Sequence, residues 1–416
     1  QCHRRRRCQR PGAVAGMKKW LSIIGIGEDG LAGLGEAARA AIDGAEIVVG
    51  GERHLAMLGD DQRPRLTWDN ALHATVAKLA NYKGQRVCVL ATGDPMSYGI
   101  GVTLCREFGA ESCLVIPHQS AFSLACARLG WPLADVDCTT LHGRPLGLLN
   151  QHLRPNARIL ILSGDGDTPK HVARMLRAGG YGDSTMTVFE HLGGPRERRH
   201  DGTARTWRRK TADLNTIALQ CVAAGEMPRL MRAAGLPDEL FQHDGQLTKR
   251  DVRAVTLAAL APAPGALMWD VGAGAGSIAI EFLRMEPTAQ AIAIEQSRKR
   301  AGSIRVNGEN LGVQNLRIVK GTAPAALRGL PRPDMIFIGG GVSDRKVLNA
   351  CWRALPKGGR LIANAVTIEG ETALFELMRA RGGGITRIEV SHLDGMGDLH
   401  AWRAMRPVTQ YRGVKS

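Results

Sequence analysis

Aromatic residues are scarce in this 416-residue chain, where Phe, Trp and Tyr together make up 4% of the sequence. Proteins that bind single-stranded nucleic acid stack bases on aromatic side chains set among basic residues. No basic run in this sequence is interleaved with aromatics in that way. The composition therefore argues against a nucleic-acid partner, although the formal net charge is +16.

Acidic residues are also few, with 39 Asp and Glu against 55 Lys and Arg. Residues 1–16 hold five arginines and no acid, which leaves a net charge of +11 spread over residues 17–416. A polyanionic small substrate explains this excess as well as RNA does, and a solvated Arg-rich surface accounts for much of it. Residues 1–16 lack the apolar segment of a secretory signal, so we expect a disordered leader or an artefact of the start site outside the fold.

Long apolar runs and paired cysteines are missing as well. The longest apolar stretches fall well short of the roughly 18 residues that a membrane helix needs, so we expect no membrane association. The nine cysteines form no Cys-x-x-Cys pair, and Cys88, Cys126 and Cys221 lie inside apolar runs. An odd number of buried cysteines predicts a reducing cytoplasm, without disulfides and without a metal site.

Apolar runs alternate with amphipathic helical windows along most of the chain, which predicts α/β architecture. Residues 186–189, 204–207 and 217–222 are closely spaced strand candidates, which suggests an antiparallel end to the first domain. Periodicity then fails over residues 225–246, where Gly and Pro are frequent, so we expect a linker there. The predicted domains are residues 17–224 and 247–416, the second being a doubly wound sheet of seven strands with helices on both faces.

The most informative motif is Asp-Val-Gly-Ala-Gly-Ala-Gly-Ser at residues 270–277, which follows a strand pattern and opens a helix. The next strand ends at Glu295. The glycines allow the backbone to approach a ligand, and the acid can accept both hydroxyls of a ribose. Asp270 would repel a pyrophosphate, so the motif favours the cationic sulfonium of S-adenosylmethionine over a dinucleotide. Glycines that only tighten a strand-to-helix turn are the remaining interpretation.

Two loops in the first domain are also rich in glycine. Residues 25–30 match Gly-x-Gly-x-x-Gly, but Glu28 and Asp29 would repel a pyrophosphate and the next strand ends without a ribose-binding acid. Residues 91–99 follow a strand with a turn in which Pro95 presets φ and Asp94 offers an acceptor to a ligand.

These loops carry a resemblance. Gly25-x-Gly27, the Gly93-Asp94-Pro95 loop with Gly99, and residues 116–121 resemble the tetrapyrrole (class III) methyltransferases, whose cofactor lies between two α/β lobes. With residues 50–55, 141–145, 190–195, 235–238, 246–253 and 321–327, they resemble the fused, decarboxylating precorrin-6Y C5,15-methyltransferases of cobalamin biosynthesis. The likeness covers residues 17–413. It implies an N-terminal tetrapyrrole methyltransferase domain of two α/β lobes and a C-terminal Rossmann-like (class I) methyltransferase domain.

The resemblance implies one S-adenosylmethionine site in each domain. The implied cofactor residues are Thr92, Gly93, Asp94, Ser97, Ser120 and Ala121 in the first domain, and Thr248, Gly272, Gly274, Gly276, Glu295 and Ala323 in the second. The class often has Gly-Gly before the aspartate, where this chain has Thr92-Gly93, and a backbone contact survives that change. Gly25 and Gly27 would face the substrate, and the chain would form a homo-oligomer.

The resemblance further implies that precorrin-6B is converted to precorrin-8. The first domain would methylate C5, and the second would methylate C15 and remove the carboxylate of the C12 acetate. The substrate is a macrocycle with carboxylates at its rim, which Arg side chains bind well. The substrate-binding candidates are Arg53, His54, His142, Arg144, Lys249 and Arg253. Each is equally consistent with a solvated surface residue. Alignment by the protein suffices for methyl transfer, so no catalytic triad or metal cluster is expected.

Two other functions remain open at this point. The second domain alone suggests an RNA methyltransferase, but an Asn-Pro-Pro-Tyr-like base pocket is replaced by Ile-Gly-Gly-Gly at residues 338–341. A non-catalytic tetrapyrrole carrier is the other alternative. It would bind the macrocycle without retaining S-adenosylmethionine.

Overall fold

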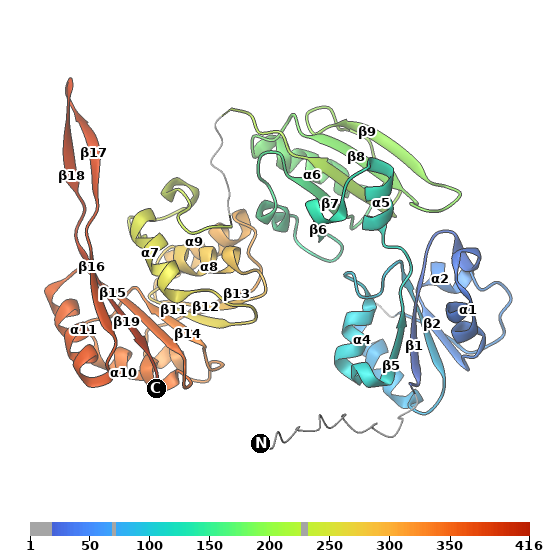
Figure 1. Ribbon diagram of the computed structural model, residues 1–416, viewed down its shortest axis with the longest axis horizontal. Coiled ribbons are helices and arrows are strands. Elements are labelled where there is room, and N and C mark those ends of the chain that lie inside the picture. The colour runs from blue at the N-terminus through green and yellow to red at the C-terminus, as the bar shows by residue number, and fades with distance from the viewer. Residues whose placement is uncertain (1–18, 69–71, 226–231) are drawn as a thin grey trace, which may run out of the picture. The chain divides into compact units, whose positions relative to one another are not determined.

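The computed structural model describes residues 19–68, 72–225 and 232–416, which form two compact units (Figure 1). The first unit comprises the described residues up to Gly143 together with Arg158–Gln220, and the second comprises Arg144–Ala157 and the described residues from Cys221 onward. The predicted leader, residues 1–16, lies outside the described residues.

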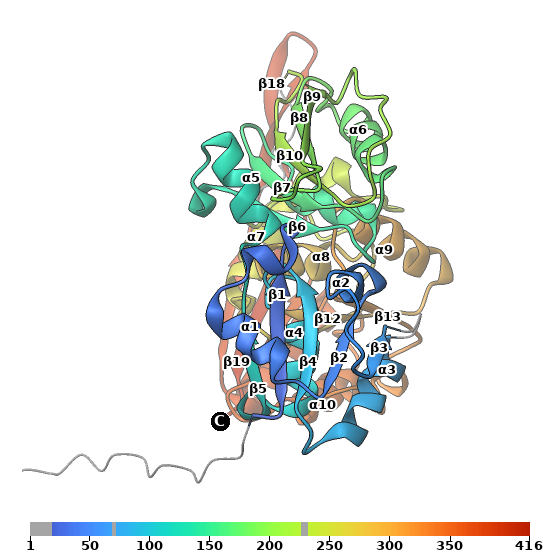
Figure 2. The ribbon, with the colours of Figure 1, turned by 90° about the vertical axis from the view of Figure 1, so that its right-hand side faces the viewer.

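The first lobe of the first unit is a five-stranded parallel sheet in the order β3-β2-β4-β1-β5 (Figure 2). Successive residues of a strand face opposite sides, and both sides are covered by helices. Ile23 and Val89 pack with Leu104, whereas Ile24 and Leu90 pack with Ile42. The elements are β1 (Leu21–Ile26), α1 (Glu36–Asp43), β2 (Ile47–Gly50), α2 (Glu52–Ala56), β3 (Arg65–Thr67), α3 (Leu72–Leu79), β4 (Val87–Thr92), α4 (Ile100–Phe108) and β5 (Cys113–Ile116).

The second lobe is a mixed five-stranded sheet in the order β6-β7-β10-β8-β9, in which β6 and β7 are parallel and the other pairs antiparallel. The expected antiparallel arrangement is confirmed, but the predicted strand at residues 204–207 is wrong. The strand that lies between the other two in the chain spans Arg198–Thr203 instead, and the Trp207 N–H donates to the Thr203 carbonyl to close a turn. The elements are α5 (Ala121–Leu129), β6 (Asp137–Thr140), β7 (Arg158–Leu162), α6 (Thr168–Ala178), β8 (Thr185–Glu190), β9 (Arg198–Thr203) and β10 (Asn215–Gln220).

The second unit is built on a seven-stranded sheet in the order β13-β12-β11-β14-β15-β19-β16, of which the first five strands are parallel. The chain reverses its direction of winding between β11 and β14, which is where doubly wound sheets bind ligands. The elements are α7 (Arg250–Leu260), β11 (Leu267–Val271), α8 (Ser277–Met285), β12 (Gln290–Glu295), α9 (Arg298–Asn310), β13 (Leu316–Lys320), β14 (Met335–Ile338), α10 (Arg345–Ala354), β15 (Arg360–Ala365), α11 (Ile368–Arg381), β16 (Gly384–Ile388) and β19 (Val408–Val414).

The core of this unit also has two layers. Met268 and Phe337 pack against α7 and α8, whereas their neighbours Trp269 and Ile336 pack against α10 and α11. Strands β17 (Ser391–Met396) and β18 (Leu399–Ala404) form a hairpin that extends away from the main sheet (Figure 1). The predicted number of seven strands in the main sheet is confirmed, but no residue range was predicted for β16, β19 or the hairpin.

The expected linker at residues 225–246 is only in part a connecting segment. Residues 226–231 lie outside the described residues, but Leu236 and Phe241 are buried against Ile280 and Leu311. Their apolar side chains therefore belong to the core of the second unit. The many Gly and Pro residues hid this, because they interrupt the periodicity without preventing burial.

Candidate functional sites

The glycine motif of the second unit forms the turn between β11 and α8. Gly272, Gly274 and Gly276 all have positive φ, which favours glycine. A Cβ on Gly272 would lie 2.6 Å from the Gly340 Cα, and one on Gly274 would lie 2.8 Å from the Gln246 carbonyl oxygen. The Gly272 and Ala273 N–H groups donate to the Ile294 carbonyl, at 3.0 and 3.1 Å. The glycines therefore let three chain segments converge at the carboxyl edge of the sheet.

Glu295 ends β12 beside this turn, and its side chain is 3% exposed. Its Oε2 accepts the Gly274 N–H at 2.9 Å, and its Oε1 accepts the Ser297 N–H at 2.9 Å. A carboxylate oxygen has more than one lone pair, so each oxygen can accept a further hydrogen bond. Glu295 is thus a rigidly held acceptor of the kind that binds a pair of ribose hydroxyls.

Asp270 lies at the end of β11 and is 1% exposed. Its Oδ2 accepts the Ala279 N–H at 3.1 Å, and its Oδ1 has no hydrogen-bond partner among the described residues. Burial raises the pKa of Asp270 to about 7, and the nearby Glu295 charge adds to this, whereas the Ala279 N–H opposes it. Asp270 is therefore poised between its neutral and charged forms at neutral pH.

A cavity of about 690 Å³ opens over the glycine turn. Five of the six predicted cofactor residues of this domain line it, namely Thr248, Gly272, Gly274, Glu295 and Ala323. The predicted substrate residue Lys249 lines it as well. The sixth, Gly276, does not line the cavity. A Cβ on Gly276 would lie 2.9 Å from the Ile304 side chain. Its role in the structure is to let α9 pack against the turn.

The expectation that Arg253 binds substrate is wrong, because its side chain is fully buried. Its guanidinium donates to Glu281 at 2.5 Å, to Asp238 at 3.0 Å, and to the carbonyls of Thr248 and Leu236. These bonds fix the segment before α7 to the second unit. Arg253 is not among the residues that line the cavity.

The cavity also contains residues that were not selected from the sequence. Asn364, at the carboxyl end of β15, donates to Thr256 Oγ1 at 2.9 Å and accepts from Gln410 Nε2 at 3.0 Å. Thr256 and Gln410 are fully buried, so the Asn364 amide is held in one orientation. A polar residue that follows an apolar strand run was the signal that could have found it.

Arg406 lines the same cavity and is exposed. Two other cations of the lining are neutralised, since Arg300 contacts Asp244 at 3.0 Å and Lys249 contacts Asp238 at 3.6 Å. Arg406 has no such partner among the residues that the structure describes. It is therefore available to an anionic group of a ligand.

In the first unit, the predicted cofactor loops meet at Gly93, which follows β4. The Gly93 N–H donates to the Ile26 carbonyl at 3.0 Å, and the Gly93 carbonyl accepts the His118 N–H at 3.1 Å. A Cβ on Gly93 would lie 3.1 Å from the Gln119 carbonyl oxygen, next to Ser120 at the start of α5. Two of the predicted segments, residues 92–97 and 118–121, are thus side by side.

The polar groups of these segments stabilise their own turns. Asp94 Oδ1 accepts the Met96 N–H at 2.8 Å, and the Asp94 carbonyl accepts the Ser97 N–H at 3.0 Å. Ser120 caps α5 by accepting the Ser123 N–H at 3.1 Å, directly before Ala121. The backbone of this region is therefore set before any ligand binds.

Arg53 and His54 extend from α2 to the end of β4. Arg53 donates to Thr92 Oγ1 at 2.8 Å, and His54 Nε2 lies 3.0 Å from the same oxygen. Burial, together with the Arg53 charge, lowers the pKa of His54 to about 4, so this imidazole is neutral at neutral pH. The structure thus brings two predicted substrate residues against a predicted cofactor residue.

Glu28 links this group to the second lobe. It pairs with Arg53, and its Oε2 lies 2.7 Å from His191 Nδ1 and 3.5 Å from Arg196 Nη2. Burial acts to raise the pKa of Glu28, but the hydrogen bond from His191 and the Arg53 charge outweigh it, so the pKa is lowered. The sequence indicated only that Glu28 disfavours a pyrophosphate, because its partners lie 25 and 163 residues away along the chain.

The remaining substrate candidates of the first domain are less closely associated. Gly25 is buried, and a Cβ there would lie 1.9 Å from the Gly93 carbonyl oxygen, so the expectation that it faces substrate is wrong. Gly27 lies beside Asp29 and the His118 ring. His142 and Arg144 are exposed and belong to different units.

Comparisons with known proteins match both units. Residues 21–207 match the model of the tetrapyrrole (corrin/porphyrin) methylases, and residues 239–415 match that of the precorrin methyltransferase domain. A Sinorhizobium protein named precorrin-6Y C(5,15)-methyltransferase [decarboxylating] is 45% identical over 399 residues, which cover 95% of this chain and 96% of that protein. The chain belongs to this family.

Two shorter relatives correspond to parts of the chain. A cobalt-precorrin-7 C(5)-methyltransferase of Salmonella typhimurium is 33% identical over 43% of this chain and 89% of its own length. A probable cobalt-precorrin-6B C(15)-methyltransferase (decarboxylating) of Saccharolobus solfataricus is 36% identical over 32% of this chain and 71% of its own length. The family is one of decarboxylating methyltransferases that act on precorrins in cobalamin biosynthesis, and such a family implies S-adenosylmethionine as the methyl donor.

Proposed function

We propose that this chain methylates precorrin-6B at C5 and C15 and removes the carboxylate of the C12 acetate, giving precorrin-8. The observation that carries the proposal is the 45% identity to a precorrin-6Y C(5,15)-methyltransferase over nearly the whole of both chains. In each methylation the carbon–sulfur bond of the donor breaks, a carbon–carbon bond forms, and the ring gives up a proton. In the decarboxylation carbon dioxide leaves, and the methylene carbon that keeps the electron pair takes up a proton.

The two domains divide this chemistry. We assign C5 to residues 17–224, and C15 with the decarboxylation to residues 247–416. Two relatives named for one position each, C5 or C15, support the division, because each corresponds to only part of this chain.

In the second domain the donor would occupy the cavity over the glycine turn. Glu295 would accept the ribose hydroxyls, the backbone at Gly272 and Gly274 would pass along the donor, and Thr248 and Ala323 would close the cavity. The donor supplies an electrophilic methyl group on a cationic sulfur. The residues present fit it, because the Glu295 carboxylate is fixed by two backbone N–H groups and a Cβ on either glycine would clash.

In the first domain we assign the second donor to Thr92, Gly93, Asp94, Ser97, Ser120 and Ala121. Support comes from the contact between the two loops at Gly93 and from the absence of side-chain bulk there. The neutral His54 and the paired Arg53 would face the macrocycle beside Thr92. Because Glu28 already neutralises Arg53, we assign Arg53 an orienting role rather than that of a free carboxylate anchor.

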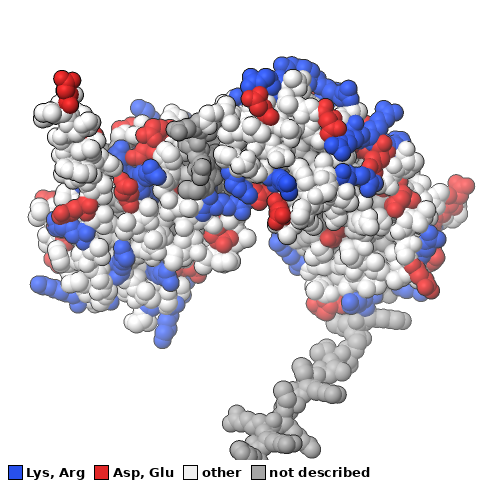
Figure 3. All heavy atoms as spheres, turned by 45° about the horizontal axis from the view of Figure 1, so that its top comes forward, with Lys and Arg blue, Asp and Glu red and all other residues white. Residues whose placement is uncertain are grey.

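The remaining substrate contacts are assigned by charge. We propose that His142 and Arg144 bind rim carboxylates, and that Arg406 does so beside the C15 donor. Lys249, which pairs with Asp238, would contact the substrate at the rim of the cavity as an orienting residue. On the face shown in Figure 3, Lys and Arg are interspersed with Asp and Glu, which does not favour a continuous phosphate-binding surface.

No helix in residues 19–68, 72–225 and 232–416 has the length and apolar character needed to cross a bilayer. We place the enzyme in the cytoplasm.

We further propose a homo-oligomer in which the β17–β18 hairpin contacts a second copy. Leu393, Met396, Leu399 and Trp402 on this hairpin are 55–73% exposed. Isolated two-stranded hairpins are marginally stable in water, and exposed apolar groups favour burial against a partner. Sedimentation of Trp402→Lys should show a smaller species than the unmodified chain, and unchanged sedimentation would refute this role.

The test of the function uses a Gly274→Val variant of the full chain. Valine at a positive φ, with its Cβ 2.8 Å from the Gln246 carbonyl, should close the donor cavity of the second domain. Mass spectrometry of the product should then show one added methyl group and no loss of carbon dioxide. The control is Gly302→Ala on α9, where a Cβ meets nothing within 4 Å. Double methylation with decarboxylation by Gly274→Val would refute the two-site assignment.

A further inference from the structure

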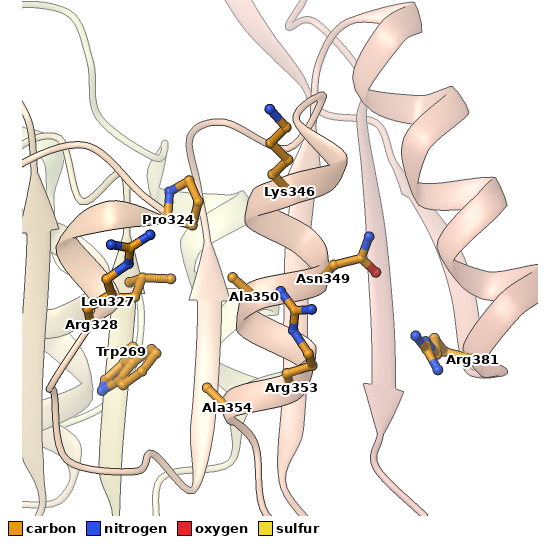
Figure 4. Close-up of a pocket in the computed structure, with 10 residues that line it drawn as sticks. All are labelled: Trp269, Pro324, Leu327, Arg328, Lys346, Asn349, Ala350, Arg353, Ala354 and Arg381. Carbon is orange, nitrogen blue, oxygen red and sulfur yellow. The ribbon is translucent and has the colours of Figure 1, made fainter.

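A second cavity in the second unit lies outside the donor cavity and shares no lining residue with it. It measures about 820 Å³ and is lined by residues from β11, α10, the end of α11 and the segment after β13 (Figure 4). The lining residues are Trp269, Pro324, Leu327, Arg328, Lys346, Asn349, Ala350, Arg353, Ala354 and Arg381. The proposed methylation chemistry makes no use of it, although Pro324 and Leu327 belong to the 321–327 motif.

The charge of this lining is of one sign. Four of its ten residues are Arg or Lys, and none is Asp or Glu. By contrast, Arg345 on α10 pairs with Glu376, and Arg387 on the nearby β16 pairs with Glu371 at 3.0 Å. None of the four lining cations has an ion pair or a side-chain hydrogen bond to any described residue. Like charges around one hollow attract and concentrate anions.

Apolar side chains lie between two of these cations. Figure 4 shows Arg328 and Arg353 on opposite sides of the cavity, with Leu327, Ala350 and Ala354 between them. A small inorganic anion would contact only one side of such a cavity. A ligand with carboxylates spaced around an apolar body would contact both sides and cover the apolar surface as well.

We propose that this cavity binds a tetrapyrrole polycarboxylate at a site separate from the donor cavity. The choice of ligand rests on the proposed function, because the substrate of that reaction has this combination of an apolar macrocycle and rim carboxylates. The arginine guanidinium groups bind carboxylates in a planar, two-pronged geometry, and the Lys346 ammonium supplies a further point charge.

Lys346 provides a direct readout on the full chain. Amine acylation with acetic anhydride is measured by peptide mass spectrometry, with and without uroporphyrin as the polycarboxylate probe. At a probe concentration about ten times its Kd, about a tenth of the sites stay free, so acylation of Lys346 should slow about tenfold. Lys357, which is exposed and does not line the cavity, should react at an unchanged rate.

The variant Arg328→Glu with Arg353→Glu should lose this protection, whereas Arg379→Glu, an exposed change outside the cavity, should keep it. Donor binding by dialysis confirms that both variants are folded and reports on the proposed function independently. Unprotected Lys346 in the unmodified chain would overturn the proposal, as would protection that survives in the double variant. Equal protection by pyrophosphate, or protection by an RNA oligonucleotide alone, would also overturn it.

Discussion

Replacing Glu295 by Gln tests the donor site of the second domain with a minimal change of shape. Both carboxylate oxygens already accept a backbone N–H at 2.9 Å, and the side chain is 3% exposed. A bound ribose would add two hydroxyl donors to the same charged group. Glutamine removes the charge and places an amide NH₂ where one acceptor stood.

The magnitude follows from these hydrogen bonds. A hydrogen bond to a charged group contributes about 1.5–3 kcal/mol, against about 0.5–1.5 kcal/mol for a neutral pair. Losing one charged bond costs about 1.5–3 kcal/mol and weakening the other to a neutral bond costs about 1–1.5 kcal/mol more, so donor binding weakens by roughly 2.5–4.5 kcal/mol. This corresponds to a Kd for S-adenosylmethionine that rises roughly 70-fold to 2000-fold.

Isothermal titration of the full chain measures this change, and the first domain serves as an internal reference. The unmodified chain should bind two donors, and Glu295→Gln should weaken one of them and leave the other unchanged. The control is Glu369→Gln, an exposed carboxylate of α11 that does not line the donor cavity. Two undiminished sites in Glu295→Gln would show that this carboxylate does not bind the donor.

Three further changes probe the groups around the two sites. Because the pKa of Asp270 is raised, its contribution to stability is fully present below a pH of about 3.8 and is lost as the pH rises through about 7. The free energy of unfolding in urea should therefore shift in favour of Asp270→Asn, relative to the unmodified chain, by about 3 kcal/mol between pH 5 and pH 8. A difference between the two proteins that does not change with pH would contradict a buried carboxyl that titrates in this range. Glu28→Gln should lower kcat/KM for C5 methylation roughly tenfold, because the first domain loses its link between Arg53 and His191. Methylation at C15 should be unchanged. Product mass spectrometry measures both, and an equal loss at the two carbons would contradict this role of Glu28. Arg406→Met should raise KM for the macrocycle about tenfold at an unchanged donor Kd, as expected for one lost carboxylate contact, and an unaltered KM would remove Arg406 from the substrate site.

Local patterns in the sequence were enough to predict the α/β class and the glycine turn between β11 and α8. Strand periodicity and positive-φ glycines depend on residues that are neighbours in the chain, and Glu295 follows the turn at the spacing that a βαβ unit requires. The family likewise follows from motifs distributed over both domains. These features were predictable because short-range geometry determines them.

Only the tertiary structure decided which charged residues are available. Arg253 and Arg406 are equivalent in the sequence, yet Arg253 is buried against Glu281 and Asp238. Arg406 instead lines the cavity over the glycine turn and forms no ion pair with any residue that the structure describes. Glu28 meets His191 across 163 residues, and the linker-like segment at Leu236 enters the core. Whether a charge is neutralised or a loop is buried depends on partners that are distant in the chain, and neither composition nor periodicity contains those pairings.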